Sequence, residues 1–143
     1  MRPDPTILLV EDSRDDADLV RIGMAEAGVT ARLDVVPGGG DALDYVRGQG
    51  AFAGRERPDL VLLDLNLPDL DGREVLRAMK DDPDLCSIPV IVMSTSVDDK
   101  DVAATYRMHA NSFVSKPPDF DELVATLTAI ASFWLRVARL PTD

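Results

Sequence analysis

Residues 58–72, which read PDLVLLDLNLPDLDG, constrain the fold more than any other part of the chain. The run 60–63 is apolar at every position, which is typical of a strand buried on both faces of a parallel sheet. Asp64 follows this run, and Pro68 and Gly72 mark a loop and the start of a helix. The segment therefore predicts a central strand with an acid at its carboxyl end. In open α/β sheets, ligands bind at that edge.

Strand and helix patterns alternate along the rest of the chain. Strands are predicted at 6–10, 32–36, 90–93 and 111–115, and helices at 14–27, 41–47, 72–81, 98–108 and 119–139. Five strand–helix repeats predict an α/β fold with one parallel sheet, helices on both faces and right-handed crossovers. A length of 143 residues suits a single domain.

Charge and cysteine content exclude several classes of function. The chain has 15 Lys and Arg against 26 Asp and Glu, a net charge of −11 that argues against a nucleic-acid partner. Its single cysteine, Cys86, allows no internal disulfide and favours a reducing compartment. No apolar run approaches the roughly 20 residues that cross a bilayer, and no secretory signal is evident. We therefore expect a cytoplasmic protein without a membrane partner.

Two glycine-containing stretches have conformational rather than chemical interpretations. Gly38–Gly40 could cradle a phosphate, but Leu43 stands where a dinucleotide fingerprint needs its third glycine, and no Gly-Lys-Ser/Thr follows. We interpret the triplet as a turn, with Asp41 capping the helix after it. Residues 48–57 are predicted to form a flexible surface loop with Phe52 as its only large anchor.

Polar side chains follow four of the five predicted strands. They are Glu11 and Asp12, Asp64, Ser94 and Thr95, and Lys116. Three carboxylates at one sheet edge repel one another and need a cation, and an all-oxygen ligand set favours Mg²⁺. With an ammonium and a hydroxyl beside them, they describe a pocket for a phosphoryl group, in which an aspartate can act as nucleophile.

The order of these features resembles the receiver domain of two-component response regulators. An acid pair follows the first strand, an Asp with Pro four and Gly eight residues later follows the third, Ser/Thr follows the fourth, and Lys-Pro follows the fifth. The resemblance implies a flavodoxin-like, doubly wound (βα)5 domain spanning 1–143. Its core would be 6–128, and 129–143 would form an extended C-terminal helix and tail.

The resemblance also assigns roles to the residues at the sheet edge. It implies that Asp64 accepts phosphate from the phosphohistidine of a sensor histidine kinase. Asp12, Asp64 and the backbone carbonyl of Asn66 would ligate Mg²⁺, with Glu11 assisting largely through water. Lys116 would pair with the phosphoryl oxygens.

Two further positions match the conformational switch of that family. A phosphoryl oxygen would draw the hydroxyl of Ser94 inward, beside Thr95, and the aromatic ring of Phe113 would follow it. Phe113 lacks the hydroxyl that the family often carries there, and its other interpretation is an ordinary core aromatic.

A narrower resemblance is to stand-alone regulators paired with phytochrome kinases, through LDLNLPDLDGREVL, IPVIVMSTS, HANSFVSKP and FWLRVARLP. His109 departs from this pattern because a glycine is usual there. We interpret it as a surface residue at a helix end. The final helix carries two apolar stripes, and we expect Phe133 and Trp134 to anchor a homodimer, the alternative being a tail folded onto its own domain.

The favoured interpretation is thus a phosphorylation-driven switch without an attached output domain, which turns over no external metabolite. One alternative is a phosphatase of the haloacid-dehalogenase type, but Asn66 stands where such enzymes need a second acid. Another is a flavodoxin-like binding module, but Glu11 and Asp12 would repel a phosphate in the absence of metal.

Overall fold

A computed structural model describes residues 4–96 and 98–141, in which strands and helices alternate as predicted. In chain order the elements are β1 (Thr6–Val10), α1 (Arg14–Glu26), β2 (Arg32–Val36), α2 (Gly39–Arg47), η1 (Gly50–Phe52), β3 (Leu60–Leu63), α3 (Gly72–Asp81), β4 (Val90–Ser94), α4 (Asp99–Arg107), β5 (Ser112–Ser115), α5 (Phe120–Ser132) and η2 (Phe133–Val137). No helix within the described ranges is both long and apolar enough to cross a membrane.

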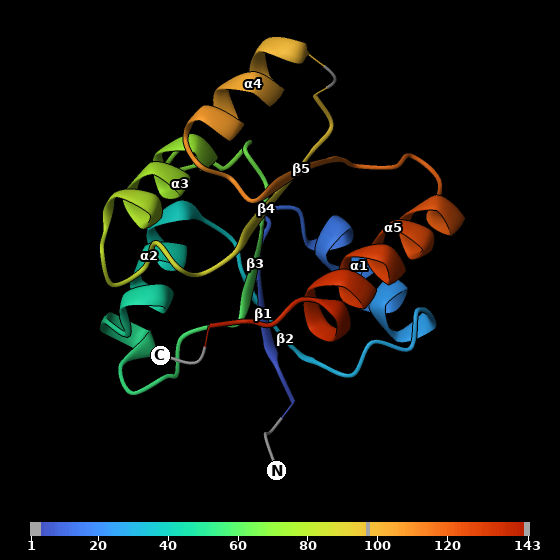
Figure 1. The fold of residues 1–143 in the computed structure, drawn as a ribbon, viewed down its shortest axis with the longest axis horizontal. Helices are drawn as coiled ribbons and strands as arrows, with labels where there is room; N and C mark the ends of the chain where they lie inside the picture. The colour runs from blue at the N-terminus through green and yellow to red at the C-terminus, as the bar shows by residue number, and fades with distance from the viewer. Residues whose placement is uncertain (1–3, 97, 142–143) are drawn as a thin grey trace.

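The five strands form one parallel sheet in the order β2-β1-β3-β4-β5. Helices α1 and α5 cover one face, and α2 and α3 cover the other, with α4 beyond α3 (Figure 1). The predicted doubly wound, flavodoxin-like sheet is confirmed. Because the strand order reverses between β1 and β3, their carboxyl ends flank the crevice where ligands bind in such sheets.

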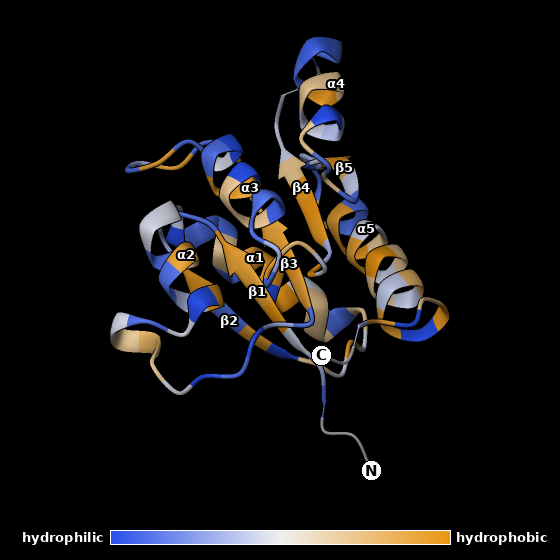
Figure 2. Cartoon of the chain, turned by 60° about the vertical axis from the view of Figure 1, so that its left-hand side comes forward, coloured by the Kyte–Doolittle hydropathy of each residue, from blue (hydrophilic) through white to orange (hydrophobic). Residues whose placement is uncertain are grey.

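Alternate residues of the strands feed two separate hydrophobic clusters. Leu8 and Val10 of β1 pack with α2 and α3, whereas Ile7 and Leu9 pack with α1 and α5. All four residues of β3 are fully buried, and the central strands β1, β3 and β4 are mostly hydrophobic (Figure 2). Burial on both faces is the reason that these strands lack polar alternation.

The glycine triplet is not a turn, as the sequence suggested, but the start of α2. The helix begins at Gly39, and its cap comes from Asp69, whose carboxylate accepts the backbone N–H of Gly39 at 2.8 Å and of Gly40 at 2.9 Å. These bonds lower the pKa of Asp69. A Cβ on Gly39 would lie 2.8 Å from the Cβ of Leu70, so glycine permits this close approach.

The predicted flexible loop at 48–57 has more anchors than Phe52 alone. It contains the 3₁₀ turn η1, and the ring of Phe52 lies 5.3 Å from that of Tyr45. Arg55 forms an ion pair with Asp34 at 3.1 Å and lies over the Tyr45 ring. These contacts tie the loop to the edge strand β2.

The predicted final helix, to about Arg139, is close to the observed helical segment, which ends at Val137, but its last turn is π-helical. The α-helix ends at Ser132, a π-helical turn occupies η2, and Ala138 has an extended backbone. Continuation is opposed by Pro141, which disfavours helical geometry in the residue before it. Trp134, which lies in this turn, packs against the hydrophobic cluster on the α1–α5 face.

Candidate functional site

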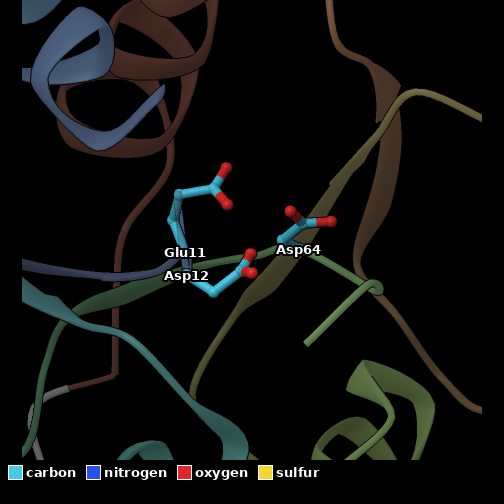
Figure 3. Close-up of side chains that lie close together, drawn as sticks. All are labelled: Glu11, Asp12 and Asp64. Atoms are coloured by element: carbon cyan, nitrogen blue, oxygen red, sulfur yellow. The ribbon is translucent and has the colours of Figure 1, made fainter. Parts of the chain in front are cut away.

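Three carboxylates from two strand ends converge at the carboxyl edge of the sheet. Glu11 and Asp12 follow β1, Asp64 follows β3, and one oxygen from each lies within 4.8 Å of the others. Figure 3 shows the three side chains directed into the same space. The predicted convergence of these residues is confirmed. The ligand set is all oxygen, and no described residue bonds the Asp12 carboxylate, so the cluster fits a hard divalent cation.

Lys116, at the end of β5, completes this cluster. Its Nζ donates to Oε1 of Glu11 at 2.5 Å and to Oδ2 of Asp64 at 2.9 Å. It also lies 3.9 Å from the carboxylate of Asp16 on α1. Glu11 and Asp64 are only 4% and 7% exposed, so a cation is needed to offset the charge of the buried acids. A single ammonium leaves the group of carboxylates net negative.

Burial and pairing act in opposite directions on the ionisation of this cluster. Burial raises the pKa of Glu11 to about 7, although the hydrogen bond and charge of Lys116 lower it. Burial alone would lower the pKa of Lys116, but its hydrogen bonds to Glu11 and Asp64 raise it overall. The ammonium is therefore fixed in its charged form.

The backbone after β3 holds the Asp64 side chain in place. The N–H of Asn66 donates to Oδ1 of Asp64 at 3.1 Å, and the N–H of Gly72 donates to the carbonyl of Leu65 at 2.9 Å. A Cβ on Gly72 would lie 2.4 Å from the carbonyl oxygen of Asp64. Helix α3, which begins at Gly72 and is capped by Asp71, therefore packs directly against the backbone of Asp64.

The hydroxyl residues after β4 occupy different environments. Ser94 is 1% exposed, and its Oγ accepts the N–H of Ser96 at 3.1 Å. Thr95 is exposed and lines a cleft of about 520 Å³ that also reaches Asp64 and Lys116. Apolar side chains of β1, β3 and β4 also line this cleft, as does Leu19 of α1.

Phe113 is half-buried and packs against the cluster on the α2–α3 face. Its backbone N–H donates to Oη of Tyr106 on α4 at 3.1 Å, a contact that sequence reasoning missed. His109 closes α4 with φ of 72°, which agrees with its interpretation as a helix-end residue. It adopts the conformation that usually requires glycine.

The structure places the two expected interface residues differently. Phe133 is 51% exposed, whereas Trp134 is partly buried against its own domain. Their rings form an edge-to-face pair with centroids 5.2 Å apart.

Comparisons with known proteins agree with this geometry. Residues 7–128 match the family model described as response regulator receiver domain. Response regulator Rcp1 from Synechocystis sp. is 41% identical over 97% of this chain and 95% of its own. The phosphorylated cyanobacterial phytochrome response regulator RcpA superposes with a TM-score of 0.92 at 41% identity, covering 97% of this chain and 99% of its own.

A second similar structure is the Mn²⁺-bound form of response regulator Rcp1, with a TM-score of 0.89 at 40% identity, covering 96% of this chain and 99% of its own. The family match favours neither the haloacid-dehalogenase nor the flavodoxin alternative. The chain, a homologue of phytochrome-associated regulators, therefore belongs to the response regulator receiver family of two-component signalling.

Proposed function

We propose that Asp64 accepts a phosphoryl group from the phosphohistidine of a sensor histidine kinase. The observation that carries this proposal is the convergence of three carboxylates and Lys116 around one point of the sheet edge. In the transfer, an Asp64 oxygen forms the new bond to phosphorus, the phosphorus–nitrogen bond breaks, and the imidazole leaves with the electron pair. Lys116 Nζ, 2.9 Å from Oδ2, is placed to pair with the incoming phosphoryl oxygens.

We further propose that the site requires Mg²⁺. Asp12, Asp64 and the carbonyl of Asn66 would hold the ion, with Glu11 assisting through water. The cation supplies charge neutralisation for the acids and for the transferred group. Support comes from the oxygen-only ligand set and from the relative Rcp1, whose structure has been determined with Mn²⁺.

The experiment is labelling with acetyl phosphate in the presence of Mg²⁺. Wild type should form an acid-labile adduct that EDTA abolishes, and Asp64→Asn should form none. Lys116→Ala should still label but show a weaker conformational response. Asp81→Asn, on the exposed end of α3, is the matched control and should label like wild type. An Asp64→Asn variant that labels as wild type does would refute the nucleophile assignment.

The same chemistry leads us to propose that the protein promotes only its own phosphorylation and dephosphorylation. Sustained hydrolysis of p-nitrophenyl phosphate would contradict this.

We propose a phytochrome-type histidine kinase as the partner. This rests on the similarity to RcpA and Rcp1 and on two exposed apolar residues of α1, Leu19 at 43% and Ile22 at 52% exposure. Leu19 borders the cleft that reaches Asp64, so a kinase helix bound there would lie beside the acceptor. Transfer from a panel of phosphorylated kinases, with phytochrome and other sensor types included, tests the pairing. Equal rates from every kinase would contradict it.

We also propose a homodimer anchored by Phe133, with Trp134 fixing its ring from behind. Large exposed aromatic rings are typical anchors of protein interfaces. Sedimentation of wild type, Phe133→Ala and Trp134→Ala should show a dimer only for wild type, and Ile22→Ala on α1 should remain dimeric. Identical monomer masses for wild type and both aromatic variants would end this proposal.

A further inference from the structure

A chain of polar contacts runs from helix α3 through helix α4 to the hydroxyl of Ser94. Arg73, in the first turn of α3, donates to Oδ1 of Asp101 on α4 at 2.9 Å. The other carboxylate oxygen of Asp101 accepts the hydroxyl of Ser96 at 2.7 Å. The backbone N–H of Ser96 in turn donates to Oγ of Ser94. We call Arg73, Asp101 and Ser96 the α3–α4 link.

The two ends of the link are themselves fixed. Arg73 also pairs with Asp71, the cap of α3, at 3.2 Å, so its guanidinium is held beside the loop that carries Asp64. Ser94 is buried at the end of β4, and its hydroxyl position depends on the Ser96 N–H that it accepts. A hydroxyl accepting one hydrogen bond can still donate another. The contacts thus leave the proton of Ser94 available.

Helix α4 depends on such contacts more than the other helices do. Among its described residues only Thr105 is buried, whereas α1, α2, α3 and α5 each bury three or four residues. A helix with little apolar burial is held by its polar contacts and moves at low cost. The hydrogen bond from Ser96 is the main cause that lowers the pKa of Asp101, and the charge and hydrogen bond of Arg73 lower it further.

We propose that the α3–α4 link holds Ser94 and helix α4 in their unphosphorylated arrangement and opposes the inward movement of the Ser94 hydroxyl. Its three members are positioning residues, because none of them touches the acceptor Asp64. The proposal rests on the proposed function, in which a phosphoryl group on Asp64 attracts that hydroxyl. Inward movement pulls Ser94 from the N–H of Ser96, which Asp101 and Arg73 restrain. Removal of the link should therefore favour the phosphorylated arrangement.

The test compares Asp101→Ala with Asp99→Ala, a matched control on the same helix. Asp99 is exposed and makes no hydrogen bond within the described residues. Because both variants exchange Asp for Ala in the first turn of α4, they gain the same helix propensity and lose the same charge. Asp101→Ala should label with acetyl phosphate about threefold faster than wild type, the ratio expected for a surface ion pair and its hydrogen bond. Asp99→Ala should label at the wild-type rate. Ser96→Ala should reproduce the increase, and the double variant should add nothing to it.

A second readout separates positioning from a general loss of stability. Amide exchange in the unphosphorylated protein should accelerate at residues 94–96 and 98–107 in Asp101→Ala and stay unchanged in α1 and α5. If wild type takes the label but Asp101→Ala labels no faster than wild type, the proposed role of the link is wrong. An additive effect in the double variant would overturn it as well. A wild-type protein that takes no label would overturn the proposed function itself, and the inference with it.

Discussion

Gly72 is the position where the smallest change should do the most damage. Its backbone φ is not in the left-handed region, so conformational freedom is not the reason for glycine. The reason is contact, because an added Cβ would lie 2.4 Å from the carbonyl oxygen of Asp64 and 2.5 Å from Cα of Leu65. Both neighbours are backbone atoms, which no rotamer change can move aside.

The geometry sets the size of the expected loss. The Cβ is about 1 Å short of the 3.4 Å at which ordinary van der Waals contact begins. Either α3 or the backbone of Asp64 must shift by that amount, and overpacking against a rigid neighbour costs about 3 kcal/mol, the upper end of the usual range. For a chain of this size the loss corresponds to a fall of roughly 10 °C in Tm. A shift of about 1 Å at the acceptor should also slow labelling by on the order of 100-fold.

Urea unfolding followed by the fluorescence of Trp134, the only tryptophan, measures the free energy of unfolding. Gly40→Ala is the matched control, because its Cβ would meet only a side-chain oxygen of Asp69, at 3.1 Å, and a helix gains about 1 kcal/mol from the exchange. The free energy of unfolding of Gly40→Ala should be lower than that of wild type by no more than about 1 kcal/mol. A Gly72→Ala protein as stable as the Gly40→Ala control, with normal labelling, would refute the packing argument.

Three further predictions concern residues outside the site. Burial, followed by the hydrogen bond to Asp34, raises the pKa of Tyr45 to about 12, so its contribution to stability is complete below pH 10 and is lost as pH rises towards 12. Between pH 9 and pH 11 the free energy of unfolding, measured with urea, should therefore fall by about 1.3 kcal/mol more in wild type than in Tyr45→Phe, and equal falls would contradict this. His109→Gly should raise the free energy of unfolding by about 0.5–1 kcal/mol, because it removes left-handed strain, and His109→Ala should not. Lys80→Met should lower the free energy of unfolding by about 2 kcal/mol, since its Nζ donates to three acceptors at 2.9–3.0 Å. Arg77→Met, on the exposed face of the same helix, is the control. An equal loss in Arg77→Met would show that only helix propensity is measured.

The convergence of Glu11, Asp64 and Lys116 could be predicted from the sequence. Glu11 and Asp64 each follow a run without polar alternation, and Lys116 follows a short run bounded by turn signals. Parallel strands align their carboxyl ends at one edge of the sheet. Glu11 and Lys116 are 105 positions apart, yet both follow strands of one parallel sheet and therefore lie at its carboxyl edge. The sequence by itself therefore determined the fold class and the chemistry of the site.

Contacts between loops and helix ends were decided only by the tertiary structure. Asp69 caps a helix 30 positions earlier, and Arg73 meets Asp101 28 positions later. Hydrophobic periodicity reports which side of an element is buried, but not which surface polar groups come within hydrogen-bond distance. The end of α5 is a similar case, because its apolar stripes continue past Ser132 whereas the chain there forms a π-helical turn in which Trp134 packs on its own domain. A local pattern specifies an element, whereas the position of one element on another depends on side chains far apart in the chain.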